Sequence, residues 1–258
     1  MSGALHAEWT KLRTVAATGW LLLGVVALTI TVSAVVALAV TYASVGSGED
    51  ITRLSLTGVY LGQAIIAILA VLTIAGEYSS GMILVTLTAT PRRPSMLAAK
   101  AVNLTALVVA AGTLAILGSL LAGRLFLPGG GFTSAHGYQL LSLSHGPTLR
   151  AAAGSVIYLA LIGLLSLGIA TAVRDPAVGV GLVLGLLYLF PILAALAPDP
   201  HLRRHLEQIG PMTAGLAIQA TTNLRGLAIR PWPGLGVLAA WAAAALLAGG
   251  FVLSRRDA

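Results

Sequence analysis

Residues 76–100, GEYSSGMILVTLTATPRRPSMLAAK, form the longest connection with several polar residues that we expect on the inner side of a membrane. The stretch opens with Glu77 and Tyr78 directly after an apolar run. It continues with the helix-unfriendly Ser79-Ser80-Gly81 and later contains Pro91-Arg92-Arg93-Pro94. A passive link between two helices is usually only a few residues long. We therefore expect a functional segment here, with the rest of the chain holding it in place.

The composition is that of an integral membrane protein. Of 258 residues, 57% are hydrophobic and 9% are charged, whereas a soluble domain is about 25% charged. The formal net charge of +7 does not indicate nucleic-acid binding, because the basic residues are scattered in loops without a clustered stripe. Arginines beside lipid headgroups explain the excess. The absence of cysteine excludes disulfides and thiolate metal sites.

Six apolar runs are long enough to cross a bilayer, which takes roughly 20 residues each. They cover about residues 19–42, 55–76, 101–123, 151–173, 177–197 and 234–253. None of these runs contains Asp, Glu, Lys or Arg, and a charge at mid-bilayer would cost about 3 kcal/mol. We predict an all-α integral membrane protein with six transmembrane helices in a single domain, residues 1–258.

The residues before the first run predict a short helix on the membrane surface. Within residues 2–14, Leu5, Trp9 and Leu12 share one helical face. Trp9 suits the headgroup layer, and Lys11 and Arg13 just before the first run place that end in the cytoplasm. The alternative, a signal peptide, is disfavoured because its apolar region spans only roughly 7–15 residues. Six crossings then return the C-terminus to the cytoplasm.

The outer segment between the last two runs, residues 198–233, predicts a surface helix followed by a buried segment. Leu202, Leu206 and Ile209 lie on one helical face, and Pro211 ends the helix. The apolar residues 212–220 are too few to span, so we expect them to dip back and lie buried against the other helices.

Two pairs of histidines are candidate metal ligands. His201 and His205 have the i, i+4 spacing of zinc sites, but no third ligand is evident. His136 and His145 lie in a glycine-rich outer loop. We expect no metal site at either pair.

Short connections and glycine pairs predict helix contacts. The link Arg174-Asp175-Pro176 is so tight that the fourth and fifth helices should be antiparallel neighbours. Gly58 with Gly62, and Gly181 with Gly185, form faces on which helices approach closely, within one chain or in a dimer.

The sequence lacks the motifs of an enzyme that hydrolyses ATP. Its two lysines, Lys11 and Lys100, follow Thr10 and Ala99 rather than the glycine of a phosphate-binding loop. Hydrolase and metalloprotease motifs are also missing. Because the apolar runs hold no ionisable group that could couple transport to an ion gradient, we expect any driving force to enter through a partner at the cytoplasmic face.

Several stretches resemble the permease subunits of type-2 ABC exporters, in particular the actinobacterial type. They are Glu77-Tyr78-Ser79-Ser80-Gly81, residues 149–174, residues 211–215 and residues 241–258. The resemblance implies a plasma-membrane exporter subunit that forms the substrate pathway as a dimer. A homodimer of this chain is the expected form, and a heterodimer with a different permease stays open. It also implies two copies of a separate cytoplasmic ATPase, which binds the ATP and Mg; this chain is expected to hold no cofactor and to bind membrane lipid.

The resemblance also implies site residues. A cytoplasmic coupling helix between the second and third spans would contact the ATPase through Glu77, Tyr78, Ser79, Ser80, Gly81 and Met82. An elbow helix on the membrane surface would include Trp9, Lys11 and Arg13. Glu77 would lie near the start of the coupling helix, where we expect it to accept an arginine of the ATPase; the alternative is a capping or interfacial role. Residues 82–85 are more apolar than is usual in the family.

Two other functions stay open from the sequence. One is a membrane scaffold or sensor that binds an ATPase without moving solute, and the other is an ATP-independent carrier. The sequence does not identify the transported substrate or the residues that bind it.

Overall fold

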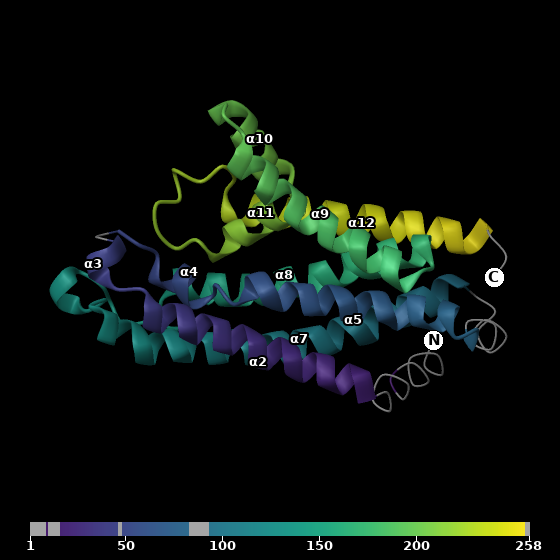
Figure 1. Ribbon diagram of the computed structural model, residues 1–258, viewed down its shortest axis with the longest axis horizontal. Coiled ribbons are helices and arrows are strands. Elements are labelled where there is room, and N and C mark those ends of the chain that lie inside the picture. The colour runs from purple at the N-terminus through teal and green to yellow at the C-terminus, as the bar shows by residue number, and fades with distance from the viewer. Residues whose placement is uncertain (1–8, 10–15, 46–47, 83–92, 256–258) are drawn as a thin grey trace.

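The computed structural model describes Trp9 and residues 16–45, 48–82 and 93–255. Six long helices run along the long axis of an elongated bundle (Figure 1). They are α2 (Ala16–Ala39), α5 (Val59–Ser79), α7 (Arg93–Phe126), α8 (Gly146–Val173), α9 (Pro176–Leu196) and α12 (Pro231–Arg255). All six are long and apolar enough to cross a membrane, and the described residues form no strand. The chain is an all-α, multi-pass membrane protein.

Short elements gather toward one end of the bundle, which we call the head. They are α3 (Tyr42–Val45), α4 (Ile51–Ser55), η1 (Leu127–Gly130), η2 (Ser134–His136), α10 (Pro200–Ile209), α11 (Pro211–Leu216) and η3 (Ala217–Gln219). At the opposite end, which we call the base, α5, α8 and α12 end while α7 and α9 begin (Figure 1). The first of the six long helices, α2, begins toward the base, and the last, α12, ends there.

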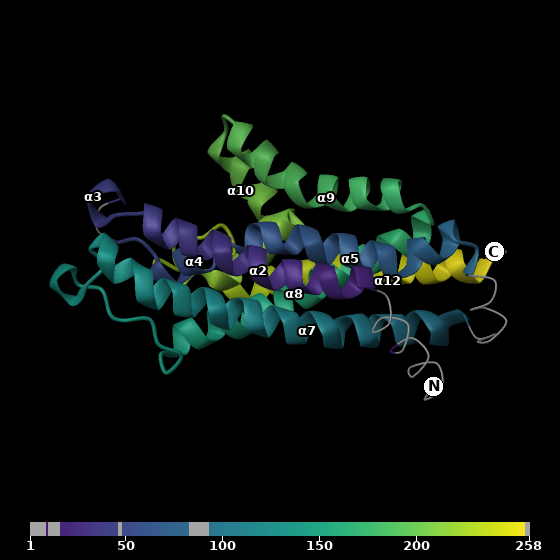
Figure 2. The same ribbon diagram turned by 60° about the horizontal axis from the view of Figure 1, so that its bottom comes forward.

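Helix α8 is the centre of the bundle, because it packs against α5, α7, α9 and α12. Its Tyr158, Leu159, Ile162 and Leu165 are fully buried. Helix α2 packs against α5 and α7, whereas α9 lies along one flank (Figure 2). The outward faces of the helices carry large apolar side chains, as a surface facing lipid requires.

The helices are longer than the apolar runs in the sequence. Helix α5 continues to Ser79 and so contains Glu77, and α7 begins at Arg93 and so contains Lys100. The apolar runs themselves hold no Asp, Glu, Lys or Arg, as the sequence shows, but the helices that contain them do. The physical reason is that a helix satisfies its own backbone hydrogen bonds and need not stop where the apolar run stops.

The tight link between α8 and α9 is confirmed. Arg174 ends α8 in the left-handed conformation at φ 66°, and the carboxylate of Asp175 accepts a hydrogen bond of 2.8 Å from the Val178 amide at the start of α9. Such a cap stabilises the first turn of a helix. The two helices lie against each other as expected.

The segment between α9 and α12 contains the two predicted elements, an amphipathic helix and a buried segment after it. Helix α10 is the amphipathic helix, with Leu202 and Ile209 exposed. Helix α11 and η3 then pass back into the molecule and pack against α8, α9 and α12. Met212, Leu216 and Ile218 are buried there.

The two glycine pairs differ in their surroundings. A Cβ added to Gly58 would lie 1.9 Å from the Thr29 carbonyl oxygen, and one added to Gly62 would lie 2.2 Å from the Thr29 hydroxyl oxygen. These glycines therefore serve packing of α5 on α2 within the chain. Gly181 and Gly185 have no atom within 4 Å of such a Cβ, so that face of α9 is open.

The predicted N-terminal surface helix lies outside the described residues, apart from Trp9. Trp9 is helical and 40% exposed. Nothing is described for Lys11 and Arg13, and the same holds for residues 83–92, which include most of the predicted coupling helix.

Candidate functional site

A buried ion pair joins α5 to α7 at the base. The Lys100 Nζ atom lies 2.8 Å from Glu77 Oε1, and the two side chains are 1% and 10% exposed. The same ammonium group donates a second hydrogen bond, 3.2 Å long, to the Thr73 carbonyl oxygen on α5. Within the described part of the chain, helices α5 and α7 make few other contacts with each other. The lysine is thus the main direct link between the two helices that flank residues 80–92.

The position of Glu77 in its helix explains its need for a cation. Glu77 lies in the last turn of α5, where the partial negative charge of the helix terminus disfavours a carboxylate. The carboxylate is also buried, and a buried charge must be paired or strongly hydrogen-bonded. Lys100, from the neighbouring helix, supplies the compensating charge.

The end of α5 is determined by serine and glycine. The Ser80 hydroxyl donates to the Gly76 carbonyl oxygen at 2.7 Å, and Ser79 donates to the same oxygen at 3.1 Å. Gly81 then turns the chain with φ 71°, a conformation that glycine adopts at little cost. Met82 follows with 47% of its surface exposed.

The expected place of Glu77 and Tyr78 in the coupling helix is corrected here. Both residues belong to the last turn of the transmembrane helix α5, and the chain leaves that helix only at Ser80. The sequence Ser79-Ser80-Gly81 ends one helix rather than beginning the next. Of the six predicted interface residues, Ser79, Ser80, Gly81 and Met82 are exposed at the base, whereas Glu77 is buried.

Two arginines cap the end of α12 at the base. The Arg93 Nη1 atom donates to the Leu253 carbonyl oxygen at 2.8 Å, and the Arg174 Nη2 atom donates to the Val252 carbonyl oxygen at 3.4 Å. The last four carbonyl groups of a helix have no partner within it, and cations near that end are stabilising.

The Arg174 guanidinium also lies 5.1 Å from the centre of the Tyr78 ring. This distance allows a cation–π interaction. Arg174 therefore connects the end of α5 to the end of α12, and the base is held together by polar contacts among α5, α7, α12 and the link from α8 to α9.

Sequence reasoning missed the contributions of Lys100, Arg93 and Arg174 to this site. It counted them among the basic residues scattered in loops. Lys100 could have been singled out, because an isolated lysine directly before a long apolar run needs a partner if the helix continues through it.

A second polar cluster lies inside the head half of the bundle. Gln63 is fully buried on α5. Its Nε2 atom lies 3.4 Å from the Tyr188 hydroxyl and 3.1 Å from the Met212 sulfur, and its Oε1 atom accepts a hydrogen bond from the Tyr158 hydroxyl. The cluster connects α5, α8, α9 and α11 at the place where α11 packs into the bundle.

The start of α4 is joined to the residues that follow η3 by one carboxylate, Asp50. It caps α4 by accepting from the Arg53 amide at 3.1 Å. It also accepts from the Thr221 hydroxyl at 2.7 Å, from the Thr222 amide at 3.1 Å and from the Thr221 amide. Four donors on one carboxylate fix the start of the loop that connects η3 to α12.

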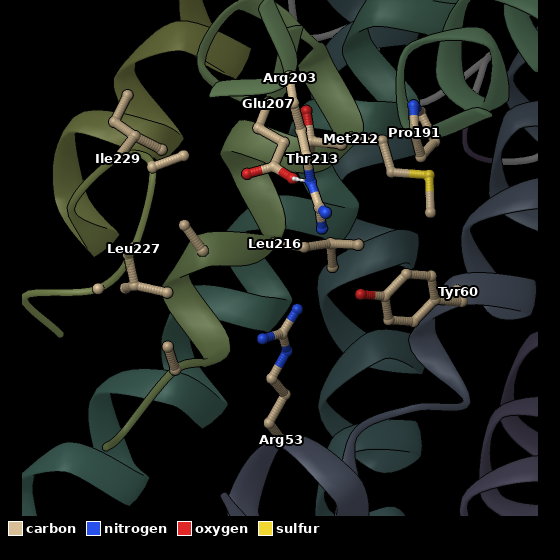
Figure 3. Close-up of a pocket in the computed structure, with 14 residues that line it drawn as sticks. Arg53, Tyr60, Pro191, Arg203, Glu207, Met212, Thr213, Leu216, Leu227 and Ile229 are labelled. Carbon is tan, nitrogen blue, oxygen red and sulfur yellow. Dashed lines mark hydrogen bonds and ion pairs between the residues drawn. The ribbon is translucent and has the colours of Figure 1, made fainter. Parts of the chain in front are cut away.

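A cavity of about 320 Å³ lies beside this loop (Figure 3). Arg53 and the hydroxyl end of Tyr60 point into it, and Arg203 pairs with Glu207 at its rim, with 3.0 Å between Nε and Oε1. An adjoining hollow of about 470 Å³ shares Arg53 and Tyr60 and is also lined by Glu49 and Asp50. Acidic and basic side chains are therefore mixed around both spaces.

The histidines lie apart from these sites. His136 stacks on Tyr42 with 4.1 Å between ring centres, and its Nδ1 atom lies 2.8 Å from the Gly131 carbonyl oxygen. His201 and His205 are exposed on α10. In the part of the chain that the structure describes, no group of three His, Cys, Asp or Glu residues could hold a metal ion.

No family model matches the chain, and comparison with curated proteins gives no significant match.

Proposed function

We propose that this protein is the membrane subunit of an ATP-driven exporter, powered by a separate ATPase that docks at the base. Two kinds of observation support the proposal. The sequence resembles type-2 ABC exporter permeases at residues 77–81 and in three other stretches. The six-helix bundle exposes residues 79–82 at its base, at the end of α5.

The observation that carries the proposal is the buried link between Glu77 and Lys100. A force applied to the segment between α5 and α7 would act on two helices that are joined at their ends. Since α5 packs on α8, and α7 on α2, a displacement at the base would reach most of the bundle. Such rigid-body motion is a common way to convert a local push into gating.

This arrangement changes the role that we assign to Glu77. Its Oε1 atom is engaged by Lys100 within the same chain, so we propose that Glu77 transmits motion rather than receiving an arginine of the ATPase. The exposed Ser79, Ser80, Gly81 and Met82 are then the proposed contact residues.

The proposal includes the remaining partners and the orientation. The base lies on the cytoplasmic side of the plasma membrane, and both termini are on that side. The ATPase binds ATP and Mg. Two permease subunits form the pathway with two ATPase subunits. The open face of α9 at Gly181 and Gly185 is a surface on which a second copy could approach closely.

Docking at the base is tested by site-directed photo-crosslinking in native membranes. One variant carries a photo-crosslinking residue at position 82, and a matched control carries it at Leu140, an exposed position at the head. We expect a nucleotide hydrolase to crosslink at position 82 only. Crosslinking at the head alone, or a hydrolase that crosslinks at neither position, would contradict the proposal.

Transport is tested with inside-out membrane vesicles and a panel of fluorescent amphiphiles. We expect uptake that requires ATP and the hydrolase. Association with the hydrolase without uptake of any probe would favour a scaffold or sensor. Uptake against a gradient by the purified chain alone would identify an ATP-independent carrier.

A further inference from the structure

Three arginines line one hollow at the head, which adjoins the cavity of Figure 3 and shares Leu227, Ala228 and Ile229 with it. The hollow has a volume of about 580 Å³. Arg204 comes from α10, and Arg225 and Arg230 come from the loop between η3 and α12, which forms a wide hook beside α10 (Figure 1). The other lining residues are Leu224, Leu227, Ala228, Ile229 and Pro231.

The charge of this hollow is not balanced by the protein. No acidic residue lines it. Among the described residues, the guanidinium groups of Arg204, Arg225 and Arg230 make no ion pair or side-chain hydrogen bond. The neighbouring Arg203 is different, because it faces the other cavity and pairs with Glu207.

The loop is held in place without help from these arginines. Gln208 on α10 donates to the Ala228 carbonyl oxygen at 2.8 Å. Asp50 holds the start of the loop through Thr221 and Thr222. The backbone that carries the three guanidinium groups is therefore held in place by other contacts. The guanidinium groups do not contribute to those contacts and are available to a ligand.

The chemistry of the lining indicates a phosphate-type anion with an apolar part. Guanidinium groups match phosphate oxygens in geometry and charge and bind them with paired hydrogen bonds. The remaining lining side chains are apolar. Trp232 follows directly with 58% of its surface exposed, and tryptophan suits the boundary between lipid and water.

We propose that Arg204, Arg225 and Arg230 form a binding site for the phosphate-type headgroup of an anionic amphiphile. The ligand is either a membrane lipid held at the headgroup layer or a solute of the same chemistry. The site does not depend on the ATPase partner, so its failure would leave the proposed function standing.

The test is calorimetric titration of the full chain in nanodiscs of neutral phosphatidylcholine, with hexyl phosphate as the probe. We expect Arg204→Gln, Arg225→Gln and Arg230→Gln each to weaken binding at least about tenfold, since each removes a charge-assisted hydrogen bond. Arg203→Gln is the matched control on the adjacent position of the same helix and should change binding less than about twofold. The arginines are exposed, and unchanged thermal unfolding will show that each variant folds.

Three results would overturn the proposal. They are no binding of hexyl phosphate, equal weakening by Arg203→Gln and Arg204→Gln, or inorganic phosphate binding as tightly as hexyl phosphate. The last result would show that the site does not bind an apolar part of the ligand, because six carbons on an apolar surface should strengthen binding at least about tenfold.

Added phosphatidylglycerol distinguishes the two sources of the ligand. If a lipid headgroup fills the site, phosphatidylglycerol in the nanodisc will lower the apparent affinity for hexyl phosphate. If the ligand is a solute from water, the affinity will stay the same. Either result supports a site for this chemistry, provided the arginine variants behave as expected.

Discussion

Replacing Lys100 with methionine should destabilise the protein strongly, because the change removes the cation beside a buried carboxylate. Two unit charges 2.8 Å apart attract by about 6 kcal/mol at an effective dielectric constant of about 20. Burying each ion costs several kcal/mol, which offsets much of that attraction. Removing Lys100 takes away the attraction but leaves the cost of burying the Glu77 carboxylate. We therefore expect Lys100→Met to lower the free energy of unfolding by about 3–5 kcal/mol.

The measurement is thermal unfolding of the purified protein in detergent, followed by tryptophan fluorescence. For a chain of this size, about 2–4 °C per kcal/mol predicts a fall in the midpoint of at least about 6 °C. The control is Glu207→Gln, which removes an ion pair of 3.0 Å at an exposed place on α10. That change should cost less than about 1 kcal/mol.

A double variant separates the ion pair from simple packing. Glu77→Gln combined with Lys100→Met removes both charges, so its destabilisation should be clearly smaller than the sum of the two single effects. If Lys100→Met is no worse than Glu207→Gln, or if the single effects simply add, the pair does not hold α5 and α7 together. The proposed transmission of motion would then lose its physical basis.

Three further predictions concern the head and the packing of the helices. Asp50→Ala should cost about 2–4 kcal/mol, since it removes a helix cap and several hydrogen bonds to a charge, and trypsin should cut faster at Arg225; unchanged cleavage would contradict the role of Asp50 in fixing the loop. Gly58→Ala should destabilise by about 1–3 kcal/mol because its Cβ would meet the Thr29 carbonyl oxygen, whereas Gly236→Ala on α12, where an added Cβ meets nothing within 4 Å, should leave the unfolding midpoint unchanged or raise it. Tyr158→Phe should cost about 1–3 kcal/mol because the buried Gln63 carbonyl loses its donor, and Tyr60→Phe, whose hydroxyl points into a cavity, should have little effect on the same midpoint.

The number and order of the membrane helices could be predicted from sequence because lipid imposes a simple rule. A segment must be apolar for roughly 20 residues to cross, and each of the six runs satisfies it. The surface helix α10 was predicted for a similar reason, since its apolar side chains recur with the period of a helix.

The site at the base could not be predicted in the same way, because it depends on where helices end and on which helices are neighbours. Glu77 and Lys100 are 23 residues apart, and each looked like the boundary of an apolar run. They come together only because α5 and α7 each pack against α2 and α8, which places the end of α5 near the start of α7. The capping of α12 by Arg93 and Arg174 involves residues 160 and 78 positions away, and no local pattern indicates such a contact.

The arginine hollow at the head shows the same limit. Arg204, Arg225 and Arg230 are separated along the chain, so sequence reasoning treats them as scattered loop charges. The hook between η3 and α12 brings them to one place, and Glu207 neutralises Arg203 while leaving Arg204 without an acid.

The close approach of α8 and α12 has a consequence for how this chain can change during evolution. A Cβ at Gly168 would lie 2.5 Å from backbone atoms of Ala245 and Leu246, and one at Gly249 would lie 2.5 Å from the Gly168 carbonyl oxygen. Neither position has room for a larger residue while the other helix stays where it is. Natural variants of this protein should therefore keep glycine at both positions, or lose it at both in lineages where the two helices have moved apart.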